Sequence, residues 1–262
     1  MDPPLCERGG SDDEWDSCIR TWYNAIVKDQ NKYILLDIPE EMPLASAIRK
    51  VPEIATQVST QGGKDVDIPV KARNPRQEEY GEGLKDLSVP LIVAAGEAGV
   101  GKTLWACEVA AALYKAGWIK RIIMTRPVVP VGGGIGFLPG PTKDKMSPWV
   151  APMKRVFEER LGKEEVAKME EGGALIAETT GTLRGHSWKH TFVICDEAQN
   201  LTQQEVKMLV TRVGFGSKLV LAGDTKQSDL VKEKDGLSHL MAMLKNVTTR
   251  LVQTIVFLPG DS

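Results

Sequence analysis

The stretch GEAGVGKT, residues 96–103, constrains the fold of this chain more than any other feature of its sequence. It fits the pattern G-x-x-x-x-G-K-[ST], follows the apolar run VPLIVAA and precedes the alanine-rich stretch TLWACEVAAALYK. Glycines allow a tight loop whose backbone N–H groups approach a phosphate chain, and the N-terminus of the following helix adds partial positive charge. The alternative is a glycine-rich turn with a solvated lysine. Because the stretch lies between an apolar run and a helical pattern, it predicts a phosphate-binding loop.

Each residue type in this loop has an expected task in binding ATP. Lys102 is predicted to reach the β- and γ-phosphates, and the Thr103 hydroxyl is predicted to bind Mg²⁺. Lys102 is therefore also a candidate catalytic residue, because it would lie beside the transferring phosphoryl group. The residues predicted to bind the nucleotide are Gly96, Glu97, Ala98, Gly99, Val100, Gly101, Lys102, Thr103 and Leu104.

A pair of acidic residues follows a second apolar run, in TFVICDEAQN at 191–200. The apolar residues 192–195 predict a buried strand that ends at Asp196 and Glu197. A second Mg²⁺ ligand belongs at the end of a strand beside the phosphate loop, and Asp196 fits that position. Glu197 is then predicted to act as the general base that polarises the attacking water. The alternative is an acidic pair that caps a helix.

Two glutamines are further candidates for contacts with the nucleotide. In LAGDTKQSDL, at 221–230, a buried strand ends at Asp224 and Gln227 follows three residues later. Ligands of open α/β sheets bind at the carboxyl ends of the strands, so Gln227 is predicted to contact the γ-phosphate or the attacking water. Gln77, about twenty residues before the loop, is predicted to pair with the adenine edge, as amides do. The alternatives are a solvated turn for Gln227 and a solvated helix start for Gln77.

The remaining pattern predicts the class of fold. Apolar runs at 89–96, 121–127, 191–195 and 217–223 alternate with helical patterns, which favours a parallel sheet covered on both faces. Thr202 and Glu205 form a capping-box pattern at the start of one helix. The four cysteines and three histidines make no metal-ligand spacing. The N-terminus has neither a basic region nor an apolar region of a secretory signal, so a cytoplasmic protein is expected.

Composition divides the chain into three parts. Residues 1–16 hold six acidic side chains and one arginine and are predicted to be a disordered acidic tail. Residues 17–70 are an N-terminal extension to which the sequence assigns no role. Residues 71–262 are the predicted ATPase domain. Since the whole chain has a net charge of −2, any nucleic-acid site must be a local groove rather than a general positive field.

Together, the stretches GEAGVGKT, TRPVV, GFLPG, DEAQNLT, LVTRVGFGSK and GDTKQSDL resemble the PhoH-like ATPases, and the resemblance covers residues 74–262. These proteins are similar to the motor domain of superfamily 1 helicases. The resemblance implies a RecA-like P-loop fold with a parallel sheet flanked by helices. It also implies Mg²⁺-dependent ATP hydrolysis, engagement of RNA or single-stranded DNA, and a homo-oligomeric ring such as a hexamer. It says nothing of residues 1–70.

The chain departs from the family pattern at three places. Pro130 stands where the family usually has an acidic residue, and His186 stands where many relatives have an arginine. In relatives the final strand continues into a Val-Arg pair, whereas this chain ends at LPGDS, so we expect that it is truncated before that arginine. Alternatively, Arg126, Arg184 or Arg212 stabilises the transition-state charge. Arg126 and Arg184 are also candidates for contact with nucleic-acid phosphates, with surface arginines as the alternative.

Two other functions compete with an ATPase that acts on nucleic acid. A P-loop small-molecule kinase usually has a basic lid, and the sequence shows no arginine-rich lid segment. A nucleotide-gated binding protein with little turnover would not need a general base such as Glu197. Stimulation of ATP hydrolysis by RNA would separate these functions.

Overall fold

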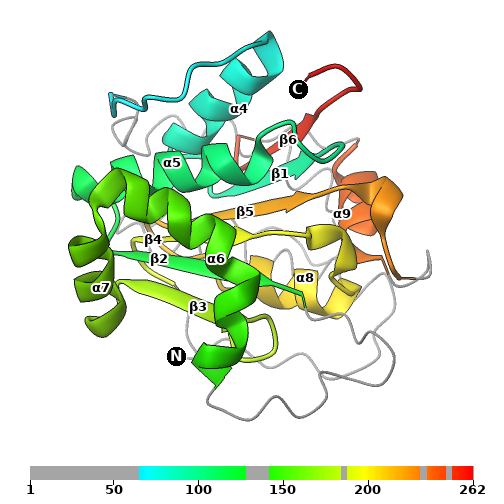
Figure 1. Cartoon of the computed structure of the whole chain (residues 1–262). Helices are drawn as coiled ribbons and strands as arrows, with labels where there is room; N and C mark the ends of the chain where they lie inside the picture. Colours follow the sequence, from blue (N-terminus) through cyan, green and yellow to red (C-terminus); the bar gives the residue numbers. More distant parts are fainter. Residues whose placement is uncertain (1–64, 128–141, 184–187, 231–234, 246–249, 262) are drawn as a thin grey trace, which may run out of the picture.

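The structure is a computed structural model that describes residues 65–127, 142–183, 188–230, 235–245 and 250–261 (Figure 1). In this part of the chain, six parallel strands form one sheet in the order β3-β2-β4-β5-β1-β6. The strands are β1 (Leu91–Ala95), β2 (Arg121–Arg126), β3 (Leu175–Thr179), β4 (Thr191–Cys195), β5 (Lys218–Gly223) and β6 (Val252–Val256). This arrangement confirms the predicted RecA-like α/β fold.

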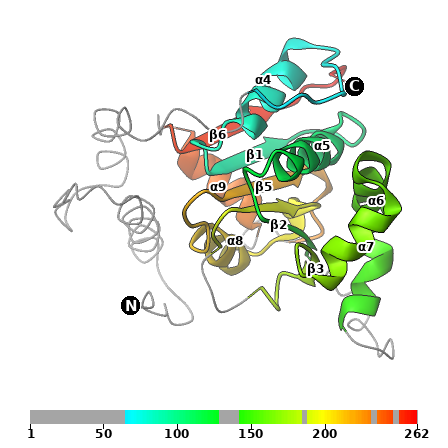
Figure 2. The same cartoon turned by 90° about the vertical axis from the view of Figure 1, so that its left-hand side faces the viewer.

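Helices cover both faces of this sheet, as Figures 1 and 2 show from two directions. The helices are α4 (Pro75–Lys85), α5 (Lys102–Lys115), α6 (Thr142–Leu161), α7 (Lys163–Glu171), α8 (Gln203–Val210) and α9 (Gly236–Leu244). Two short 3₁₀ turns, η1 (Ala198–Asn200) and η2 (Thr225–Gln227), follow β4 and β5. Helices α4 to α7 share one hydrophobic cluster with the sheet, and α8 and α9 share another.

The side chains of each strand alternate between these two clusters. On β1, Ile92 and Ala94 belong to the cluster of α4 to α7, whereas Leu91 and Val93 belong to the cluster of α8 and α9. Such alternation follows from the two-residue period of a strand. Because β1 is buried on both faces, its sequence is a continuous apolar run, as predicted.

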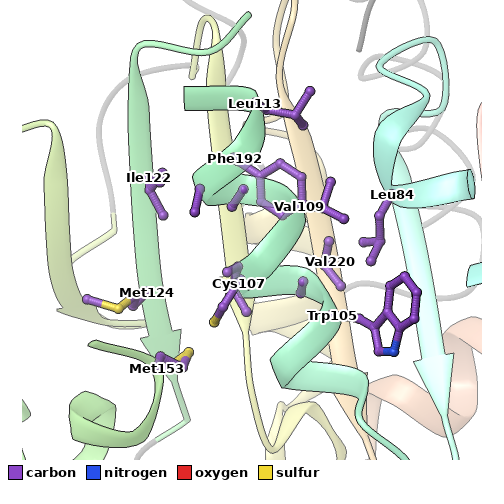
Figure 3. Packing of buried hydrophobic residues seen from close by; sticks show 14 of the residues in the cluster. Leu84, Trp105, Cys107, Val109, Leu113, Ile122, Met124, Met153, Phe192 and Val220 are labelled. Carbon is purple, nitrogen blue, oxygen red and sulfur yellow. The ribbon is translucent and has the colours of Figure 1, made fainter. Parts of the chain in front are cut away.

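Helix α5, which begins in the phosphate-loop motif, packs on the middle of the sheet. Figure 3 shows its residues Cys107, Val109 and Leu113 together with Phe192 of β4 and Val220 of β5. All of these side chains are fully buried. The packing fixes the N-terminal end of α5 relative to the carboxyl ends of the central strands.

The start of helix α8 agrees with the predicted capping box. The Thr202 hydroxyl accepts a hydrogen bond from the Glu205 backbone N–H, and the Glu205 carboxylate accepts one from the Thr202 N–H. Two donors that the first helical turn would otherwise leave unpaired are thus satisfied. A length and hydropathy sufficient to span a membrane are not found together in any helix of the described ranges.

A buried lysine lies at the opposite end of the sheet from the phosphate loop. Lys218, the first residue of β5, is fully buried, and its ammonium group donates to the carbonyl oxygens of Gly83 (2.7 Å), Asp86 (2.9 Å) and Val89 (2.6 Å). Burial lowers the pKa of Lys218 to about 7, while only the ammonium form has three N–H groups for the three carbonyls. Lys218 therefore ties the end of α4 and the approach to β1 to the centre of the sheet.

Several predictions fall on residues outside the described ranges. The acidic tail at 1–16, most of the extension at 17–70, and Pro130, Arg184 and His186 are among them. At the end of the extension, Val66, Ile68 and Val70 pack against the cluster of α4 to α7. Trp188 is buried in the cluster of α8 and α9.

Candidate active site

The phosphate-loop motif forms a loop between β1 and α5, in the predicted strand–loop–helix context. Gly99 and Gly101 have φ of 88° and 90°, and Gly101 is the N-cap of α5. Side chains other than glycine rarely adopt this backbone conformation, so both positions require glycine. The Lys102 ammonium donates to the carbonyl oxygens of Gly96 (2.7 Å) and Glu97 (2.8 Å). The lysine thus spans the inside of the loop, where a phosphate chain would lie.

The electrostatic surroundings of Lys102 combine burial and acidic neighbours. Burial lowers the pKa of Lys102, and the carboxylates of Asp224, Asp196 and Glu197 oppose that effect. These three acids come from the ends of β5 and β4, which are neighbours in the sheet. Residues far apart in the sequence therefore meet at one edge, as expected for a ligand site of an open α/β sheet.

Thr103 and Asp196, the two predicted Mg²⁺ ligands, are in direct contact. The Thr103 hydroxyl donates to Asp196 Oδ1 at 2.7 Å. Burial raises the pKa of Asp196, and the Thr103 hydrogen bond opposes that rise. The carboxylate and the hydroxyl offer only oxygen atoms as metal ligands, and a nearby cation would stabilise the partly buried negative charge. This pair therefore fits Mg²⁺.

Glu197, the predicted general base, has an unusual backbone and two side-chain partners. Its φ is 53°, in the left-handed region, which is uncommon for a residue other than glycine and is found most often at functional sites. Its Oε1 lies 3.1 Å from Arg126 Nη2, at the end of β2. Its Oε2 accepts a hydrogen bond of 2.6 Å from Gln199 Nε2. Both carboxylate oxygens are therefore engaged.

Gln199 is a site residue that the sequence reasoning missed. It is only 1% exposed, and besides donating to Glu197 it accepts a hydrogen bond of 3.0 Å from the Asp224 backbone N–H. The residue therefore connects the end of β4 to the end of β5. Gln199 follows Glu197 by two residues, shortly after the buried strand β4. That position could have indicated a residue of the site.

The loop after β5 is anchored to the phosphate loop. The Asp224 carboxylate accepts a hydrogen bond from the Lys226 N–H and caps η2. The Lys226 ammonium lies 3.1 Å from Glu97 Oε1 in the phosphate loop. Gln227 is the last residue of η2 and is exposed. Gln227 is thus at the correct edge of the sheet, and its contact with the γ-phosphate stays a prediction.

Gln77 is buried against the phosphate loop. Only 5% of the residue is exposed, so the alternative of a solvated helix start is wrong. Its Oε1 accepts from the Arg73 N–H (2.9 Å), and its Nε2 donates to the carbonyls of Val100 (3.2 Å) and Asp261 (3.3 Å). Gln77 therefore joins α4 to the phosphate loop and to the segment after β6. Its contact with adenine stays a prediction.

The fold and the site together define a class of protein. A phosphate loop between a central parallel strand and a helix, with Thr103 against an acidic residue at the end of β4, defines a nucleotide-binding P-loop protein. The family model described as "PhoH-like protein" matches residues 69–258, and the chain belongs to this family.

Curated relatives from several bacteria match this chain. A "PhoH-like protein" of Bacillus subtilis is 39% identical over 189 residues, which are 72% of this chain and 58% of the relative. A "PhoH-like protein" of Synechocystis is 36% identical over 179 residues, or 68% and 54% of the two chains. The "Protein PhoH" of Escherichia coli is 38% identical over 165 residues, or 62% and 46%. The chain thus spans about half the length of these relatives.

Two solved structures, an ATPase core and a helicase, match this chain at low similarity. The Sulfolobus solfataricus SWI2/SNF2 ATPase core in complex with double-stranded DNA has a TM-score of 0.42 and 13% identity, and it covers 75% of this chain and 46% of that chain. The Pif1 helicase from Candida albicans has a TM-score of 0.33 and 16% identity, with coverage of 72% and 41%.

Proposed function

We propose that this chain is a Mg²⁺-dependent ATPase whose activity is coupled to RNA or single-stranded DNA. The observation that carries the proposal is the position of Glu197. It follows Asp196 directly, and Asp196 bonds Thr103 at the mouth of the phosphate loop. A carboxylate beside the metal ligands is placed to act on a water that attacks the γ-phosphorus.

Each side chain of the site has a role in this proposal. Lys102 exchanges its bonds to the loop carbonyls for bonds to the β- and γ-phosphate oxygens, and its charge stabilises them. Thr103 and Asp196 would hold Mg²⁺, which when bound would supply positive charge to the phosphate groups. Glu197 accepts a proton from the attacking water while the bond between the γ-phosphorus and the β,γ-bridging oxygen breaks, which leaves ADP and phosphate. Gln227 senses the γ-phosphate. Gln77 contacts adenine by exchanging one of its Nε2 bonds, to the Val100 or Asp261 carbonyl, for a bond to the base.

Coupling to nucleic acid and assembly into a ring rest on the resemblance of the motifs to superfamily 1 helicases. One feature of the structure supports coupling: the Arg126 guanidinium lies at the carboxyl edge of the sheet and contacts Glu197. An arginine there can bind a phosphodiester group and act directly on the catalytic centre. The remaining functional alternatives are a small-molecule kinase and a binding protein with little turnover.

ATP hydrolysis measured with and without nucleic acid tests this proposal. The assay uses the full chain with Mg²⁺, alone and with saturating oligo(U) or oligo(dT). Phosphate release that increases with either oligonucleotide supports the proposal, and the preferred oligonucleotide gives the type of nucleic acid. Hydrolysis that neither oligonucleotide changes would contradict coupling. ATP binding without turnover would favour the binding protein.

Replacing Lys102 should weaken ATP binding without unfolding the chain. The expected loss in affinity for Lys102→Ala is roughly 10- to 150-fold, because hydrogen bonds to charged groups contribute about 1.5–3 kcal/mol. Titration calorimetry with Mg²⁺–ATP measures this loss. Lys115→Ala, an exposed lysine at the other end of the same helix α5, is the matched control. An unchanged affinity in Lys102→Ala would contradict the assignment of the phosphate loop.

Replacing Gln227 should uncouple hydrolysis from nucleic acid. Gln227→Ala is expected to keep its ATP affinity, because the exposed side chain makes none of the contacts that shape the phosphate loop. The stimulation of hydrolysis by oligo(U) should fall, since the loop after β5 would no longer register the γ-phosphate. The ratio of stimulated to basal rates measures the effect. If the full ratio persists, residues 224–227 are only a turn.

A further inference from the structure

The two partners of the Glu197 carboxylate differ in how readily another group can displace them. Gln199, on Oε2, is 1% exposed and is also held by the Asp224 backbone. Arg126, on Oε1, has a side chain that is 33% exposed, and that of Glu197 is 37% exposed. One partner is therefore fixed in the core, and the other can be reached from solvent.

The ion pair between Arg126 and Glu197 is by itself a weak interaction. An ion pair of this exposure shifts an equilibrium by no more than about fivefold. A phosphate group offers a guanidinium two parallel hydrogen bonds from a more highly charged acceptor, and it competes well for an arginine. A phosphodiester that reaches the carboxyl end of β2 can therefore take Arg126 away from Glu197.

Loss of the Arg126 contact changes what the Glu197 carboxylate can do. While Oε1 faces the guanidinium, Arg126 engages one of its lone pairs and competes with a water for that oxygen. When Arg126 leaves, Oε1 becomes available to water. The bond from buried Gln199 to Oε2 persists and keeps the carboxylate beside Asp196.

We propose that the Arg126–Glu197 ion pair is a latch on ATP hydrolysis, which a phosphodiester group of single-stranded nucleic acid opens by binding Arg126. The inference rests on the proposed function, in which Glu197 is the general base. Arg126 is a positioning residue in this scheme, because it acts through Glu197. The weakness of the pair limits the stimulation that this latch can give to about fivefold.

A purely supporting role for Arg126 predicts the opposite effect. If the guanidinium holds Glu197 in its productive orientation, removal of Arg126 lowers the rate without nucleic acid. If the guanidinium restrains Glu197, removal raises that rate. The sign of the change therefore separates the two roles.

The experiment compares the unaltered chain with Arg126→Gln, Arg121→Gln and Glu197→Gln. Arg121 is exposed and begins the same strand β2, at the edge of the sheet away from the site, so it is the matched control. Steady-state ATP hydrolysis is measured alone and with saturating oligo(U) or oligo(dT). We expect Arg126→Gln to raise the rate without oligonucleotide about two- to fivefold at an unchanged KM for ATP. Added oligonucleotide should then give little further stimulation, whereas Arg121→Gln should respond as the unaltered chain does.

A second measurement tests the phosphate contact. The affinity for oligo(U) is followed against salt concentration. Arg126→Gln should reduce the magnitude of the slope of log affinity against log salt by about 0.7, the contribution of one phosphate contact with a single strand. An unchanged slope overturns the phosphate contact. A basal rate that falls or stays the same in Arg126→Gln overturns the latch and leaves the proposed ATPase intact. Full turnover in Glu197→Gln would instead overturn the proposed function, independently of Arg126.

Discussion

Glu197→Gln is expected to bind ATP normally and to hydrolyse it about 10²–10⁴-fold more slowly, the usual cost of losing a general base. The substitution keeps the size of the side chain and leaves an oxygen that can accept the hydrogen bond from Gln199. It removes the group that takes a proton from water. Single-turnover hydrolysis measures the rate, and calorimetry measures the ATP affinity.

The control for this variant is a carboxylate at the same edge of the sheet. Glu178 lies near the end of β3, the outer strand, and pairs in register with Thr125 of β2. Glu178→Gln should hydrolyse ATP as the unaltered chain does. Near-normal turnover in Glu197→Gln would remove Glu197 from the mechanism. Equal losses in the two variants would point to a general effect of charge at this edge.

The second large effect is expected on stability and concerns Lys218. Lys218→Met keeps much of the volume of the side chain but leaves the carbonyls of Gly83, Asp86 and Val89 without their buried donor. The Asp86 carbonyl keeps its hydrogen bond from the Val89 N–H, so the loss falls mainly on Gly83 and Val89. Each unpaired buried carbonyl costs about 1–3 kcal/mol, and relief of the buried charge offsets part of the total. We expect the free energy of unfolding to fall by about 2–5 kcal/mol.

Urea denaturation followed by circular dichroism measures this loss. Lys226→Met is the matched control, because the Lys226 side chain is 70% exposed and makes one ion pair with Glu97. Exposed pairs contribute about 0–1 kcal/mol, so the midpoint for Lys226→Met should stay close to that of the unaltered chain. Equal midpoints for the two variants would show that the three carbonyls do not depend on Lys218.

The sequence predicted the fold, and it predicted that Thr103 and Asp196 belong to one site, because each of these depends on short-range patterns. An apolar run that ends at a polar residue places that residue at the carboxyl edge of a parallel sheet, whatever the rest of the chain does. The loop motif places Thr103 in the first turn of α5. The adjacent acidic pair Asp196 and Glu197 follows the apolar run that became β4. The structure brings Thr103 and Asp196 together at 2.7 Å. The catalytic roles of Lys102, Glu197 and Gln227 stay predictions.

The contacts that sequence reasoning missed join segments that are distant in the sequence. Lys218 lies at the start of the apolar run 217–223, where a lysine is expected to be exposed, but its three acceptors lie on residues 83–89. Gln199 lies in a motif that was recognised, yet its bond to the Asp224 backbone depends on the pairing of β4 with β5. Gln77 was expected at the nucleotide, and its burial depends on how α4 packs against the loop. No local pattern carries such information.

The strand order has a consequence for how the chain is made. Leu91, on the strand that leads into the phosphate loop, pairs with Leu219 and Val252 and with no residue that is synthesised soon after it. At about 5–20 residues per second, a ribosome needs on the order of ten seconds to deliver both neighbouring strands. During that interval β1 exposes two unpaired edges and two apolar faces, which makes it a natural target for a chaperone. The phosphate loop therefore takes its final form only after β5 and β6 have been synthesised.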